Sequence, residues 1–177
     1  MRLAIHHIVE INEDSLIFIG LGSNRPGRAG EPVEMIAAAL RALEMRGVLL
    51  RTWSVLYRSE AFPDPDDPKF LNMVVEVETD FGPTLLLRTL HEVEHALGRR
   101  RRRRNEPRSI DLDLLDYRGL VSTKDGVELP HPRLQDRSFV VAPLSEIRPN
   151  WRHPVSQKTA FMLLQALGGR KIIERVG

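Results

Sequence analysis

The order of strand-like and helix-like patterns is the feature that most constrains how this chain folds. Short apolar or alternating runs, typical of strands, occupy residues 15–22, 48–58, 70–78 and 109–117. Helical periodicity occupies residues 31–43, 83–97, 136–147 and 159–167. The first six patterns follow the order βαββαβ, which predicts an α+β fold with a ferredoxin-like core. In such a fold the helices pack on an antiparallel sheet.

Loop and turn chemistry separates these patterns. Residues 62–68 read FPDPDDP, and prolines and aspartates at this density exclude a regular element. Residues 118–129 indicate a hairpin or a turn region. Asp136 is a suitable cap for the helix expected to run to Ile147, and Gly98 is a suitable stop for the helix before it.

The composition fits one folded domain. The 177 residues are 42% hydrophobic and 28% charged, which excludes a disordered chain. No apolar run approaches the ~18 residues of a membrane span, and the absence of cysteine excludes a disulfide framework. We therefore expect a single domain over residues 15–177, located in the cytoplasm and without membrane contact. Residues 1–14 are expected to form an extension outside it.

The charge is concentrated in one segment. Residues 99–108 contain seven arginines and one acid, Glu106, a charge of +6 in a chain whose net charge is +2. The remainder is therefore mildly acidic, and the segment indicates a polyanionic ligand bound at one place. A nucleic-acid footprint and a solvated charge run are the alternatives. The segment lacks the interleaved aromatics that a single-strand binder uses for stacking.

Two carboxylates follow this segment in a strand pattern. Side chains alternate along a strand, so Asp111 and Asp113 are expected on one face and Leu112 on the other. Carboxylates about 7 Å apart on one face repel each other unless a cation lies between them. Oxygen ligands in small number suit Mg²⁺, which completes its shell with water and phosphate. A solvated strand face is the alternative interpretation.

Residues 91–95 read HEVEH, which matches the zinc-protease pattern H-E-x-x-H. The arginines that follow oppose a second cation, and no third ligand follows at short spacing. Polar residues beside a buried stripe, with Glu94 nearest that stripe, are the more economical interpretation. The chain also has no Gly-Lys-Ser/Thr phosphate loop, and Arg25 stands where a dinucleotide fingerprint would have its third glycine. Side-chain arginines would have to supply the phosphate contacts.

These segments together resemble the 6-hydroxymethyl-7,8-dihydropterin pyrophosphokinases of folate biosynthesis, over about residues 16–167. The resemblance rests on Gly22-Ser23-Asn24, Phe70-Leu71-Asn72, residues 104–115, and Pro130-His131 with Arg137 and Phe139. The family fold is ferredoxin-like. The resemblance implies an enzyme that moves the β,γ-pyrophosphoryl unit of ATP onto the hydroxymethyl oxygen of the pterin and releases AMP.

The resemblance also implies roles for single residues. It assigns Asp111 and Asp113 to two Mg²⁺ ions, and Arg99 and Arg108 to catalysis at the two ends of an arginine-rich loop that closes over the phosphates. It assigns contacts with ATP, the co-substrate, to His91, Arg101, Arg108, Leu114, His131 and Arg137. It assigns contacts with the pterin to Ser59, Phe62, Phe70, Asn72 and Phe139.

The expected partners are therefore two small molecules, ATP and a dihydropterin, bound by a monomer without nucleic acid. The chain departs from the family at Asn105, where an aromatic residue is common, and at Glu106, where a small residue is usual. A carboxylate at this place in the loop is expected either to alter how the loop closes or simply to pair with one of the six arginines.

Overall fold

The computed structural model describes residues 16–61, 64–99, 108–168 and 174–176. Their elements, in chain order, are β1 (Ile17–Ser23), α1 (Pro32–Glu44), β2 (Leu49–Trp53), β3 (Leu56–Ser59), β4 (Phe70–Glu78), α2 (Pro83–Ala96), β5 (Asp111–Tyr117), α3 (Ser138–Ile147), α4 (Ala160–Leu167) and β6 (Glu174–Val176). The strands form one antiparallel sheet in the order β5-β1-β4-β3-β6, and β2 also pairs with β4. The predicted α+β fold, an antiparallel sheet with helices packed on it, is confirmed. The predicted extension over residues 1–14 lies outside the described residues.

Two of the sequence-based boundaries need correction. The pattern over residues 48–58 predicted one strand, but the structure has two, because three residues between Trp53 and Tyr57 stand opposite two residues of β4. The buried Ser54 lies in this irregularity and is held to β4 by two hydrogen bonds with the backbone of Val74. The third helix is capped by Arg137 and not by Asp136, because the carbonyl of Arg137 accepts the N–H groups of Val140 and Val141.

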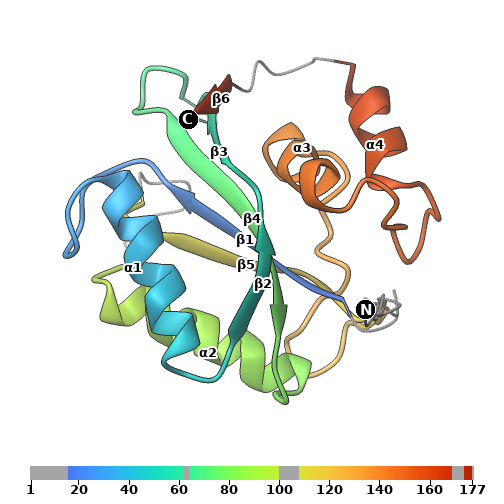
Figure 1. Cartoon of the computed structure of the whole chain (residues 1–177), viewed down its shortest axis with the longest axis horizontal. Helices are drawn as coiled ribbons and strands as arrows, with labels where there is room; N and C mark the ends of the chain where they lie inside the picture. The colour runs from blue at the N-terminus through green and yellow to red at the C-terminus, as the bar shows by residue number, and fades with distance from the viewer. Residues whose placement is uncertain (1–15, 62–63, 100–107, 169–173, 177) are drawn as a thin grey trace, which may run out of the picture.

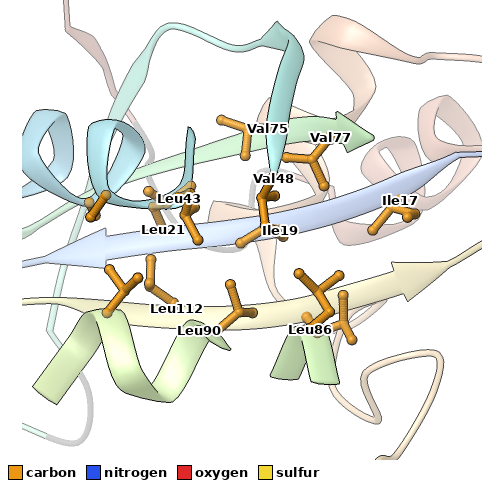
Figure 2. Close-up of a cluster of buried hydrophobic side chains, with 14 of the residues drawn as sticks. Ile17, Ile19, Leu21, Leu43, Val48, Val75, Val77, Leu86, Leu90 and Leu112 are labelled. Carbon is orange, nitrogen blue, oxygen red and sulfur yellow. The ribbon is translucent and has the colours of Figure 1, made fainter. Parts of the chain in front are cut away.

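The larger core lies between the sheet and the helices α1 and α2, which cover one face (Figure 1). The alternation of strand side chains determines which residues enter it. Ile17, Ile19 and Leu21 of β1 point to these helices, whereas Phe18 points to the opposite face. Figure 2 shows the β1 residues packed against Leu86 and Leu90 of α2 and against side chains of β4, β5 and α1.

A second core lies on the other face of the sheet, under α3 and α4 (Figure 1). Phe18 and Trp151 meet there edge to face, with ring centroids 5.8 Å apart. Thr159 caps α4 by accepting the N–H of Met162, as expected for a helix that begins at this point. The candidate site lies on this same face of the sheet, near the first residues of α3.

Candidate active site

A cavity of about 330 Å³ lies on the α3 side of the sheet, where β1 and β3 end and where β4 and β5 begin. Its lining includes Gly20 and Gly22 of β1, Ser59 of β3, Phe70 and Asn72 of β4, Asp111 and Asp113 of β5, and Phe139 of α3. Four adjacent strands and the start of one helix therefore hold these residues around one space.

Two glycines make room for this cavity. Gly20 and Gly22 occupy the positions of β1 that face the cavity, two and four residues after the buried Phe18. A Cβ atom added at Gly22 would lie 3.4 Å from Oδ1 of Asn72 and 3.7 Å from Cδ1 of Phe70. The floor of the cavity is thus bare backbone, which lets a ligand approach the sheet closely.

The carboxylates of Asp111 and Asp113 lie on the same face of β5, as the alternation predicts. They stand opposite Gly22 and Gly20 in the pairing of β5 with β1, while Leu112 between them enters the larger core. Both carboxylates are partly exposed, with 23% and 36% of their side-chain surface open to solvent. They are accessible to a ligand that enters the cavity.

Each carboxylate faces cations. Asp111 lies 2.8 Å from the guanidinium of Arg99 and 2.6 Å from that of Arg108. Asp113 lies 3.4 Å from Arg137 and 3.9 Å from Nε2 of His131. The structure therefore brings six ionisable groups, from four segments of the chain, to one end of the sheet: two carboxylates, three guanidinium groups and one imidazole.

The environment of His131 favours its neutral form. Burial lowers the pKa of His131, and the positive charges of Arg137 and Arg133 lower it further, against the attraction of Asp113. Nδ1 of His131 accepts the backbone N–H of Arg133 at 3.1 Å, so the remaining ring nitrogen, Nε2, faces Asp113. At neutral pH the arginines are therefore the main positive charges beside the carboxylates.

An aromatic and amide slot adjoins the charged end. Phe70 and Phe139 both line the cavity, and the guanidinium of Arg137 lies 5.5 Å from the ring centroid of Phe139. The amide of Asn72 is buried, and its Nδ2 donates to Oγ of Ser59 at 2.9 Å. Its Oδ1 lies beside Gly22 at the floor. Flat rings with a fixed amide edge suit a planar heterocycle that has polar edges.

Glu94 joins the site although the sequence assigned it no role there. Its side chain is 4% exposed, forms an ion pair with Arg99, and accepts the N–H of Leu112 on the edge strand β5 at 2.8 Å. Burial raises the pKa of Glu94 to about 7, although the charge of Arg99 and the hydrogen bond from Leu112 act in the opposite direction. The sequence indicated the burial of Glu94 only through its position next to the apolar stripe of α2.

Other predicted residues lie elsewhere. Leu114 is packed in the larger core on the opposite face of β5, and its neighbour Leu115 lines the cavity on the face of the carboxylates, as strand alternation requires. His91 lies on the exposed surface of α2 and does not line the cavity. Arg101 and Phe62 fall outside the described residues, as do Asn105 and Glu106.

The zinc-protease interpretation of residues 91–95 gains no support. Glu94, inside the pattern, is buried against β5, and His95 is exposed. In the described ranges no group of three or more His, Asp or Glu side chains is placed to hold a metal ion. Within those same ranges, none of the helices has the length and apolar character needed to cross a bilayer.

The fold and the cavity define a class of protein: a ferredoxin-like α+β domain that presents a carboxylate pair and arginines beside an aromatic slot. The chain matches the family described as 7,8-dihydro-6-hydroxymethylpterin-pyrophosphokinase (HPPK) over residues 18–149, more than half of its length. The chain belongs to this family.

Curated relatives agree with this assignment. A Synechocystis protein named 2-amino-4-hydroxy-6-hydroxymethyldihydropteridine pyrophosphokinase is 35% identical over 148 residues, which cover 83% of this chain and 73% of the relative. An Aquifex aeolicus protein of the same name is 36% identical over 142 residues, 80% of this chain and 86% of the relative. The Dictyostelium discoideum folic acid synthesis protein FOL1 is 33% identical over 80% of this chain, which spans only 21% of that longer protein.

Solved structures agree at the level of the fold. The crystal structure of wild-type Plasmodium falciparum HPPK-DHPS with SDX-DHP superposes with a TM-score of 0.69 at 14% sequence identity. The match covers 88% of this chain and 44% of the Plasmodium chain. The ferredoxin-like architecture therefore matches one portion of a longer solved chain.

Proposed function

We propose that this protein transfers the pyrophosphoryl group of ATP to the hydroxymethyl oxygen of 6-hydroxymethyl-7,8-dihydropterin. A bond forms between that oxygen and the β-phosphorus, the bond from the β-phosphorus to the bridging oxygen of the α-phosphate breaks, AMP leaves with the electron pair, and the hydroxyl proton is released. The observation that carries the proposal is a single cavity in which the slot of Phe70, Phe139 and Asn72 adjoins the carboxylates of Asp111 and Asp113.

The donor set fits a hard cation. Asp111 and Asp113 offer carboxylate oxygens from one strand face and leave most of a coordination shell to phosphate and water, which is how proteins hold Mg²⁺ with a nucleotide. We propose that these two carboxylates bind two Mg²⁺ ions. When bound, such ions would neutralise the triphosphate and align the attacking oxygen with the β-phosphorus.

The arginines would bind the phosphate groups of the nucleotide. Arg99 and Arg108 both contact Asp111, and Arg137 contacts Asp113, so a cation bound by these carboxylates would release guanidinium groups toward the incoming anion. We propose that Arg99 and Arg108 stabilise the negative charge that develops on the transferred group. Arg137 and His131 would bind the nucleotide. The assignments of His91, Arg101 and Leu114 to the nucleotide rest on the resemblance.

The slot would hold the pterin. Phe70 and Phe139 would lie against the two faces of the bicyclic ring, and Asn72, fixed by Ser59, would read its pyrimidine edge. Phe62 is assigned to this subsite by resemblance. We propose that the protein acts as a monomer.

The test is an incubation of the protein with ATP, Mg²⁺ and 6-hydroxymethyl-7,8-dihydropterin, with the pterin omitted as a control. We expect one AMP per pterin consumed. The variants Asp111→Asn and Asp113→Asn should each be slower by about 10³-fold or more, because metal-ion stabilisation supplies several kcal/mol. Asp80→Asn, at an exposed aspartate outside the cavity, should match the unaltered protein. ADP as the sole nucleotide product would contradict the proposal.

A further inference from the structure

Asn24 directly follows β1 and binds to two segments that border the cavity. The residue is 3% exposed. Oδ1 accepts the backbone N–H of Arg108 at 2.7 Å, and Nδ2 donates to the carbonyl of Pro68 at 2.9 Å. Because one partner can only donate and the other can only accept, a single orientation of the amide satisfies both bonds.

The backbone of Asn24 adds a second bond to the same arginine. Its N–H donates to the carbonyl of Arg108 at 3.1 Å. Both backbone polar groups of Arg108 are therefore held by one residue. The guanidinium of Arg108 reaches Asp111 at 2.6 Å, so the position of this cation beside the carboxylate depends on Asn24.

The bond to Pro68 fixes the other half of the cavity. Pro68 lies two residues before Phe70, the first residue of β4 and one wall of the aromatic slot. The same buried amide of Asn24 thus holds a segment on the phosphate side of the cavity and a segment on the heterocycle side. The link is direct, because no further side chain stands between Arg108 and Pro68 in this chain of hydrogen bonds.

We propose that Asn24 is a positioning residue that couples the two halves of the cavity, so that binding of the nucleotide strengthens binding of the pterin and the reverse. The inference rests on the proposed function. A ligand that orders one of these segments also holds the amide of Asn24 in the orientation that the other segment needs. Less conformational entropy is then lost when the second ligand binds, so the second ligand binds more tightly.

Asn24→Asp separates the two bonds. A carboxylate still accepts from the N–H of Arg108 but cannot donate to the carbonyl of Pro68. Ser23→Ala is the matched control. It alters the adjacent buried residue and removes a bond of 2.7 Å from Oγ of Ser23 to the carbonyl of Ser109, which lies on the arginine side alone.

The measurement is the dissociation constant of 6-hydroxymethyl-7,8-dihydropterin without and with saturating α,β-methylene-ATP and Mg²⁺. In the unaltered protein and in Ser23→Ala we expect the nucleotide analogue to tighten pterin binding at least fivefold. In Asn24→Asp the ratio should fall to within twofold of unity. Simple damage to the pterin subsite would weaken binding in both conditions and leave the ratio unchanged, and that result would overturn the inference, as would a ratio of one in the unaltered protein.

A measurement on the unaltered protein makes the same test if Asn24→Asp does not fold. Pterin alone should slow hydrogen exchange of the Arg108 backbone amide, which lies on the nucleotide side, and an unchanged rate would overturn the inference. AMP release by the unaltered protein distinguishes the two failures. Its absence contradicts the proposed function, whereas its presence together with unchanged coupling in Asn24→Asp contradicts only the role of Asn24.

Discussion

At the scale of single residues, the cavity depends on two positions without a side chain. Gly20 and Gly22 lie opposite Asp113 and Asp111, so the carboxylates and the aromatic slot face bare backbone. A larger residue would place its side chain in the space that a ligand needs. The glycine signal was visible in the sequence, but its purpose became clear only once β1 was placed between β4 and β5.

Gly22→Ala should raise the KM for the pterin about tenfold or more and leave the KM for ATP unchanged. The added methyl would lie in van der Waals contact with Asn72 and Phe70, and one methylene group in a tight pocket changes binding by that factor. Steady-state kinetics with each substrate varied will measure it. Gly82→Ala is the control, since a Cβ atom there has no neighbour within 4 Å. An unaltered KM for the pterin would show that the ligand does not use this floor.

The carboxylate pair could be predicted because strand alternation is a local rule. It placed Asp111 and Asp113 on one face without knowledge of any neighbour. The same rule places Leu114 on the opposite face, in the larger core, and Leu115 at the cavity. The register shift opposite Phe18 and Ile19, by contrast, depends on the partner strand and could not be predicted. It interrupts the alternation after Leu115, so that Asp116 bonds to Trp151 of the second core, on the same face as Leu115.

At the scale of elements, the order of strands and helices was predictable from hydrophobic periodicity, whereas irregular pairing was not. The continuous pattern over residues 48–58 concealed the break at Ser54, which exists because β4 has one residue fewer on its side. The strand β6 contains three residues and pairs with β3, which lies far from it in sequence. Neither feature leaves a periodic signal of its own.

The end of β5 carries a buried acid that makes stability depend on pH. Asp116 is 1% exposed, and burial raises its pKa from 3.8 to about 6, although Nε1 of Trp151 donates to its Oδ2 at 3.1 Å. The folded state therefore holds the proton more tightly than the unfolded state does. The stabilisation from this group is fully present below about pH 4 and is lost as the pH rises through about 6.

Asp116→Asn should remove this dependence. The free energy of unfolding of the unaltered protein, minus that of the variant, should fall by about 2 kcal/mol between pH 4.5 and pH 7.5. Urea unfolding at both pH values will measure the difference, and the subtraction cancels the other titrating groups. Parallel pH profiles for the two proteins would show that Asp116 titrates normally in the folded state.

At the scale of the whole molecule, two helical layers enclose one sheet (Figure 1). Phe139 lines the cavity from α3, so its position depends on how the layer of α3 and α4 is held to the sheet. The residue after α3, Arg148, makes two hydrogen bonds to Glu76 of β4, at 2.6 and 3.0 Å. Glu76 is 6% exposed, so its charge depends on this partner. By contrast, Arg51 and Glu78 form an ion pair with both side chains about half exposed or more.

Arg148→Gln should lower the free energy of unfolding by about 3 kcal/mol, because it leaves a buried carboxylate without its counterion. Arg51→Gln, which breaks the exposed pair, should cost less than about 1 kcal/mol. Both values come from urea unfolding at neutral pH. Equal losses in the two variants would mean that Arg148 does not fasten this layer in the way described.

The most direct test of the central claim, that Asp111 and Asp113 hold metal ions against a nucleotide, is a titration with Mn²⁺ in place of Mg²⁺, followed by electron paramagnetic resonance. In the presence of α,β-methylene-ATP the unaltered protein should bind two Mn²⁺ per chain, and so should Asp80→Asn. Asp111→Asn and Asp113→Asn should each lose at least one ion, because each removes a carboxylate ligand. Binding of two ions by a variant that lacks both carboxylates would contradict the account.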